Sequence, residues 1–100
     1  MPFEVRLSTR AGRDLIRILD DLGARDLDWA VAVDDAIAEK LEFVAQNPFL
    51  SSIFRQTSTG EVREVLAANY RIFFVVNEPD QQVVVRAIRH VRQQDPDFPE

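Results

Sequence analysis

Arginine supplies nearly all the cations in the second half of the chain, and the only histidine lies among them. The residues there that could do chemistry are Arg63, Arg71, Arg86, Arg89 and His90. Arginine presents a planar fork that binds carboxylate or phosphate through two hydrogen bonds. Histidine can act as a general acid or base if a reacting proton lies within reach. The alternative is structural: solvated strand arginines paired with Glu61, Glu64 or Glu78, and a hydrogen-bonded histidine at a strand end.

The composition excludes several kinds of active site. The chain has no cysteine and one histidine, which rules out disulfides, thiolate metal sites and multi-histidine metal sites. It contains no P-loop, GxSxG, HExxH or GxGxxG motif. Adjacent acids such as Asp34 and Asp35 diverge on a helix, so they would not converge on one substrate atom. We therefore expect no metal site and no cofactor.

The elements that must position these residues follow from the spacing of the apolar residues. The predicted elements are a strand at 3–8, a helix at 11–22, a second helix that begins near Asp26 or Asp28 and stops at QNP (46–48), a loop at 49–61, and strands at 62–67, 70–76 and 83–90. Short links between the last three strands imply an antiparallel meander. We predict one α+β domain over residues 1–100, in the order β-α-α-β-β-β, with both helices on one face of the sheet. The tail, residues 93–100, contains two prolines and should be irregular.

Both faces of the longer strands carry apolar residues, although the helices can cover only one face. In the strand at 70–76, alternation places Tyr70, Ile72, Phe74 and Val76 on one face and Arg71, Phe73 and Val75 on the other. In the strand at 83–90 it places Val83, Val85, Ala87 and Arg89 together, opposite Val84, Arg86, Ile88 and His90. Something should therefore cover the second face: the chain's own tail through Phe98, a second copy, or another protein.

The charge and hydropathy indicate a cytoplasmic protein that does not enter a membrane. The net charge of −5 argues against general attraction to nucleic acid. No apolar run approaches the roughly 18 residues of a membrane span. The N-terminus mixes Glu4 and Arg6 into a short apolar run, so it does not read as a secretory signal.

Four stretches resemble, in order, the RelE/ParE superfamily of bacterial type II toxins, also called plasmid-stabilisation proteins. They are LSTRAGRDLIRILDDL and AIAEKLEFVAQNP, which resemble the two helices, VREVLAANYRIFFVV, with the Tyr-Arg pair Tyr70 and Arg71, and VVVRAIRHVRQ, with His90. The resemblance spans residues 3–93. It implies a growth-inhibiting toxin that a cognate antitoxin neutralises, as a hetero-oligomer, by wrapping around the helices and the sheet.

The superfamily has two branches with different targets. ParE-like members poison DNA gyrase, whereas RelE-like members cut mRNA on the ribosome with cations on the sheet. For a ribonuclease, the resemblance implies catalytic roles for Arg71, His90 and Arg92, which would supply a base for the 2′-hydroxyl and charge for the phosphate. The residues that would bind a target or partner are Arg63, Tyr70, Arg86 and Arg89.

The sequence favours the ParE-like branch. Ribonuclease members often carry further cations at positions that correspond here to Val62 and Glu64. Their C-terminal aromatic residue or histidine corresponds to an acidic stretch, QQDPDFPE, without tyrosine. Two alternatives stay open: a ribosome-dependent endoribonuclease, and a non-toxic module that only binds an antitoxin.

Overall fold

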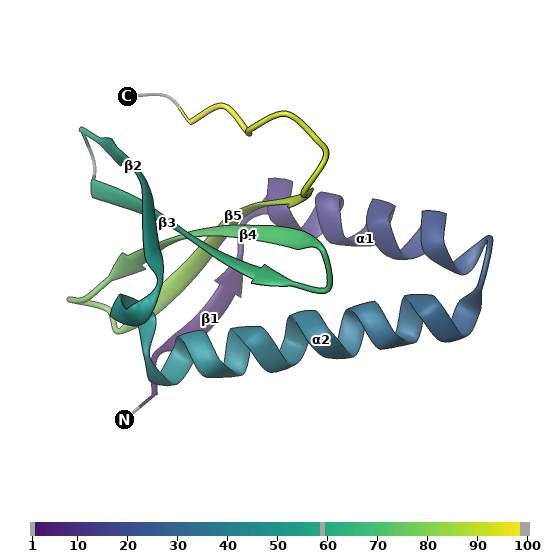
Figure 1. The fold of residues 1–100 in the computed structure, drawn as a ribbon. Coiled ribbons are helices and arrows are strands. Elements are labelled where there is room, and N and C mark those ends of the chain that lie inside the picture. The colour runs from purple at the N-terminus through teal and green to yellow at the C-terminus, as the bar shows by residue number, and fades with distance from the viewer. Residues whose placement is uncertain (1, 59, 99–100) are drawn as a thin grey trace.

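The computed structural model describes residues 2–58 and 60–98, and the chain forms one open sheet with two helices (Figure 1). The elements are β1 (Glu4–Leu7), α1 (Thr9–Gly23), α2 (Leu27–Gln46), a 3-10 turn η1 (Pro48–Leu50), β2 (Ser52–Thr57), β3 (Gly60–Ala67), β4 (Tyr70–Asn77) and β5 (Gln82–His90). In this part of the chain, no helix combines the length and the apolar character needed to cross a membrane.

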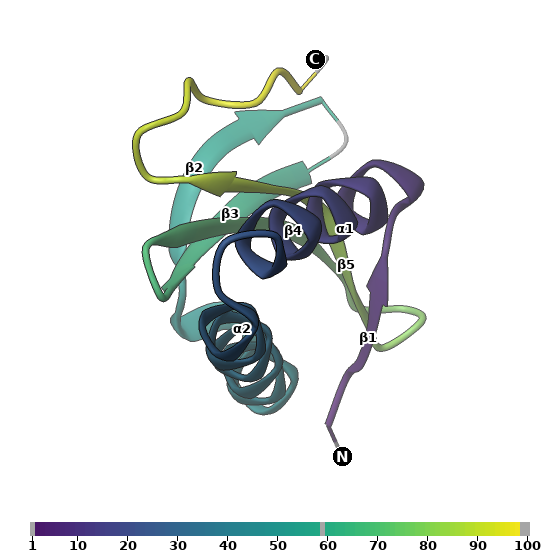
Figure 2. The same ribbon diagram turned by 90° about the vertical axis from the view of Figure 1, so that its right-hand side faces the viewer.

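The sheet is mixed, with strand order β1-β5-β4-β3-β2. The last four strands form an antiparallel meander, and β1 pairs in parallel with β5. The α-hairpin covers one face, as Figure 2 shows with the two helices in front of the strands. The predicted fold class, the order of its elements and the single helical face are therefore confirmed.

The sheet has one more strand than the sequence predicted. The sequence predicts a loop at residues 49–61, but Ser52–Thr57 form the edge strand β2. The register shifts between Ile53 and Arg55, so Phe54 is the extra residue of a bulge. A bulge breaks the alternation of side chains, which explains why this stretch shows no period of two.

The faces predicted for β5 are wrong beyond Val85, because this strand contains a second bulge. Phe73 pairs with Ala87 and Phe74 with Val85, which leaves Arg86 as the extra residue. Val83, Val85 and Ile88 consequently face the same core, whereas Ala87 joins a cluster on the other face. The faces predicted for β4 are correct, because Tyr70, Ile72 and Phe74 lie in the helix-covered core while Phe73 faces away.

Side-chain caps and a long-range tie position the helices. The Ser8 hydroxyl accepts a hydrogen bond from the Ala11 amide at 3.1 Å, and the Asp26 carboxylate accepts one from the Trp29 amide at 3.2 Å. Asp14 on α1 accepts a hydrogen bond from the Ile88 amide of β5 at 3.0 Å. These bonds fix where each helix begins and hold α1 against the sheet.

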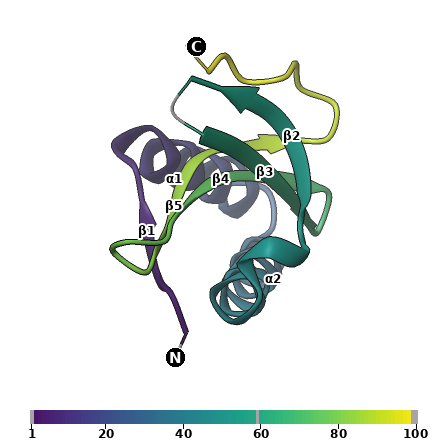
Figure 3. The same cartoon turned by 90° about the vertical axis from the view of Figure 1, so that its left-hand side faces the viewer.

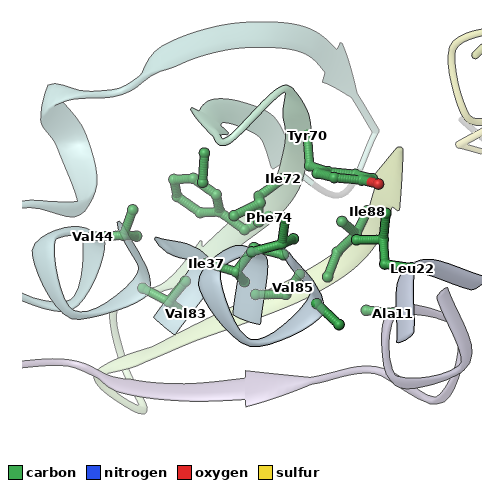
Figure 4. Packing of buried hydrophobic residues seen from close by; sticks show 13 residues of the cluster. Ala11, Leu22, Ile37, Val44, Tyr70, Ile72, Phe74, Val83, Val85 and Ile88 are labelled. Carbon is green, nitrogen blue, oxygen red and sulfur yellow. The ribbon is translucent and has the colours of Figure 1, made fainter. Parts of the chain in front are cut away.

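The main core lies between the helices and the inner face of the sheet (Figure 4). Leu22, Ile37 and Val44 from the helices meet Ile72, Phe74, Val83, Val85 and Ile88 from the strands, and all are nearly or fully buried. This packing leaves the opposite face of the sheet, hereafter the outer face, free of helices.

Candidate functional site: the outer face of the sheet

Arg71 and Arg89 lie side by side on the outer face. They are direct partners across β4 and β5, and Glu64 on β3 is the partner of Phe73. Partners in an antiparallel pair share a face, so these residues project together, away from the helices. Two like charges directly opposite each other are unfavourable unless anionic groups offset them.

Two carboxylates from distant parts of the chain hold Arg71. Its Nε donates to the Glu64 carboxylate, and its Nη1 lies 2.6 Å from Oδ1 of Asp95 in the tail. The hydrogen bond to Glu64, followed by that to Asp95, raises the pKa of Arg71 above its ordinary value. The Arg71 side chain is only 16% exposed, and its guanidinium lies 4.9 Å from the Phe73 ring. An anionic ligand would have to displace at least one carboxylate to reach this cation.

The tail covers the apolar part of the outer face. Phe98 is 3% exposed and packs with Val62, Phe73 and Ala87. Its ring centroid lies 5.8 Å from that of Phe73 and 6.2 Å from that of Phe54. Figure 3 shows the tail running along the side of the sheet away from α2. The chain's own tail therefore lies on this face through Phe98, as one of the predicted coverings.

His90 and Tyr70 form a pair on the inner face. They are cross-strand partners, and their rings meet edge to face with centroids 5.2 Å apart. Tyr70 is 8% exposed, and burial raises the pKa of its hydroxyl. Nδ1 of His90 accepts a hydrogen bond from the Arg92 amide at 3.1 Å. His90 and Arg71 therefore project from opposite faces of the sheet.

The remaining predicted site residues are dispersed. Arg92 is exposed in the turn after β5. Arg63 is 9% exposed and binds Glu61 at 2.9 Å and the Ser51 carbonyl at 2.8 Å, which ties β3 to the segment before β2. Arg86 lies in the bulge of β5 and lines a hollow with the β4–β5 hairpin. The glutamate pairing expected for solvated arginines is found for Arg63 and Arg71, with Glu61 and Glu64, but both arginine side chains are largely buried.

A shallow hollow beside Arg71 includes residues that the sequence did not single out. It is lined by Lys40, Leu50, Glu64, Leu66, Arg71 and Val91, among others. Leu50 and Leu66 are 73% and 57% exposed, so its rim is apolar. Lys40, the only lysine of the chain, could have been noted from its rarity alone. Over the described residues, no three acidic or histidine side chains gather as metal ligands would.

The arrangement suits binding better than acid–base catalysis. A cation held between carboxylates can exchange one anion for another, but it cannot remove a proton. The histidine that could do so lies on the other face, and its Nδ1 already accepts a backbone hydrogen bond. The outer face therefore offers an ionic and aromatic contact surface.

The family model described as the ParE toxin of the type II toxin–antitoxin system, parDE, matches residues 5–95. Solved structures that share the fold include two from toxin–antitoxin systems. The chain is 19% identical to a chain of the toxin–antitoxin complex RelBE2 from Mycobacterium tuberculosis, with a TM-score of 0.60 over 90% of this chain and 92% of that chain. It is 15% identical to a chain of the chromosomal ParDE system from P. aeruginosa, with a TM-score of 0.71 over 88% of this chain and 95% of that chain. No match was found among curated proteins.

Proposed function

Because the chain belongs to the ParE family of toxins from type II toxin–antitoxin systems, we propose that it inhibits growth by poisoning DNA gyrase. The observation that favours gyrase over mRNA as the target is that the Arg71 guanidinium is already paired with carboxylates. The one cation that matches the Tyr-Arg pair of the ribonucleases is held by Glu64 and Asp95. A toxin that acts by binding gyrase needs no general base, so this arrangement does not hinder it. Such a toxin would act in the cytoplasm.

Expression of the chain alone in a bacterium tests the target. We expect growth arrest, filamentous cells and double-strand breaks that disappear in a strain whose gyrase resists poisoning. Arrest with intact DNA and a rapid stop in protein synthesis would contradict the proposal. The absence of any arrest would instead favour the non-toxic binding module.

The second candidate is a ribosome-dependent endoribonuclease, favoured by the adjacent cations Arg71 and Arg89 on the outer face. Cleavage through this pair would require Asp95 to leave Arg71, and a base other than His90 on the same face. Under this alternative, Arg71→Gln abolishes mRNA cutting in a translating extract, whereas Arg86→Gln leaves it intact. Toxicity that persists in Arg71→Gln with unbroken mRNA excludes the alternative.

The cognate antitoxin is the partner that the family implies, and we propose that it forms a hetero-oligomer with this chain. Arg86 and Arg89 are better placed to contact a target or the antitoxin than Arg63 and Tyr70. Arg63 and Tyr70 are each less than 10% exposed, so a partner could reach them only if the local structure opened.

A further inference from the structure

Arginines gather at the outer face around the tail. The four that lie on it or beside it are Arg10, Arg55, Arg71 and Arg89. Glu64 offsets one of these charges through its ion pair with Arg71. Nε of Arg89 is buried and makes no hydrogen bond within the part of the chain that the structure describes. The strands therefore leave this face with positive charge that they do not neutralise.

Two of these arginines flank the tail. Arg55 on β2 is the partner of Val62, which belongs to the outer-face cluster, and its guanidinium lies 5.1 Å from the centroid of the Phe54 ring. Arg10 lies near the start of α1, and its Nη1 donates a hydrogen bond to the Asp97 carbonyl at 3.0 Å. The cations beside the tail therefore come from α1 and β2 as well as from β4 and β5.

The tail brings its own acids to this face and holds them there with an apolar anchor. The Asp95 carboxylate lies 2.6 Å from the Arg71 guanidinium, and a second aspartate, Asp97, follows two residues later. Pro96 between them is fully buried, and Phe98 is 3% exposed. The Asp95 side chain is 54% exposed, and an ion pair open to water contributes little. The burial of Phe98 therefore contributes most of the affinity of the tail for the sheet.

We propose that the tail is an autoinhibitory mask, which occupies the cations of the outer face and so keeps this face from binding RNA. RNA is the abundant polyanion of a bacterial cytoplasm, and exposed arginines attract its phosphates whatever the base sequence. A toxin that must find one protein target would be delayed by such binding. The mask does not depend on which target this is, so its test can fail while gyrase poisoning holds, and the reverse.

The mask acts locally, and the net charge of the chain does not replace it. The chain carries −5 overall, but many of its acids lie on α1 and α2, which cover the opposite face of the sheet. The field of an exposed charge is screened over about 10 Å at 0.1 M salt, so distant acids protect the outer face weakly. Asp95, by contrast, contacts Arg71 directly and occupies the position that a phosphate would take. Release of the tail should therefore expose an RNA-binding face without any change in net charge.

The substitution Phe98→Ser tests the mask, because it removes the anchor and keeps every acid of the tail. The full-length variant and the unaltered chain are titrated with a fluorescent single-stranded RNA octamer, and binding is followed by anisotropy at several salt concentrations. We expect Phe98→Ser to bind about tenfold more tightly, through arginine–phosphate contacts that the tail now blocks. The logarithmic salt dependence of its affinity should steepen by roughly 0.7 for each arginine freed. Equal affinity of the two proteins would overturn the proposal.

Matched variants separate the mask from a general effect of charge. Asp97→Asn removes one negative charge but keeps the backbone carbonyl that Arg10 binds, so its affinity for the octamer should stay within about twofold of that of the unaltered chain. A gain as large as that of Phe98→Ser would mean that net charge controls binding, contrary to the proposal. In the Phe98→Ser background, Arg89→Gln should reverse the gain, whereas Arg25→Gln, in the link between the helices, should retain most of it. Equal effects of these two substitutions would place the RNA elsewhere and overturn the proposal.

Asp95→Asn provides a second test if Phe98→Ser fails to fold, which circular dichroism would show. It removes the carboxylate that covers Arg71 and leaves the Phe98 anchor in place, so RNA affinity should rise several-fold and exceed that of Asp97→Asn. The two aspartate variants carry the same net charge but differ in the contact with Arg71. Equal affinity in both would therefore refute the mask.

Discussion

Arg71 joins three parts of the molecule that are far apart in the sequence. It lies on β4, and its partners Glu64 and Asp95 lie on β3 and in the tail. The Tyr-Arg pair made Arg71 a candidate from the sequence, and the charge pattern offered Glu64 as a partner. Asp95 could not be predicted, because an irregular tail has no periodicity that fixes its path.

Replacing Arg71 should destabilise the fold more than replacing Arg86. Arg71→Ala leaves Glu64, whose side chain is 23% exposed, without the guanidinium that it now pairs with. Because water can partly solvate the unpaired Glu64 carboxylate, we expect Arg71→Ala to lower the free energy of unfolding by only about 1–2 kcal/mol. Urea denaturation measures this loss of stability. Arg86→Ala, which removes the same charge from the β5 bulge, should cost less than about 0.5 kcal/mol. Equal losses for the two variants would show that the ion pairs contribute nothing.

The single tyrosine gives a clear optical signal for its environment. Burial raises the pKa of Tyr70, so the folded state favours the neutral hydroxyl. The resulting contribution to stability is fully present below the unfolded pKa of about 10 and is lost as the pH rises through the folded pKa. Absorbance near 295 nm should therefore rise at a higher pH in the native protein than in urea. Superimposed titration curves would contradict the burial of this hydroxyl.

At the scale of elements, the sequence predicted the order and the type of every long element but missed β2. The helices were recognisable because their apolar residues repeat at a helical spacing and Ser8 and Asp26 can cap them. Both errors in the sheet come from bulges, at Phe54 in β2 and at Arg86 in β5. A bulge changes which residues face the core, and its position depends on pairing with another strand, which a local pattern does not contain.

The N-terminal cap of α2 provides a test at this scale. Asp26→Ala removes the carboxylate that accepts from the Trp29 amide, and we expect a loss of about 1 kcal/mol in the free energy of unfolding. Asp28→Ala is a suitable control, since Asp28 lies in the first turn without capping it and should cost only a few tenths of a kcal/mol. Thermal or urea denaturation compares the two, and a larger loss for Asp28→Ala would mean that the helix begins elsewhere.

At the scale of the whole molecule, the fold separates two surfaces with different tasks. The inner face forms the core with the α-hairpin, and the outer face carries cations and aromatic rings under the tail. The sequence indicated that the outer face would be covered and suggested Phe98, because two apolar faces cannot both be buried by one pair of helices. The resemblance to the toxins came from the order of four stretches, and the family match over residues 5–95 confirms it.

The most direct test of the proposed function uses purified components. The chain is incubated with DNA gyrase, ATP and supercoiled plasmid, and the products are separated after detergent and protease treatment. Poisoning of gyrase predicts linear DNA that accumulates with toxin concentration and disappears when gyrase is omitted. In parallel, mRNA in a translating extract should stay intact. Plasmid that remains uncut while the mRNA is cleaved would contradict gyrase poisoning and establish the ribonuclease alternative.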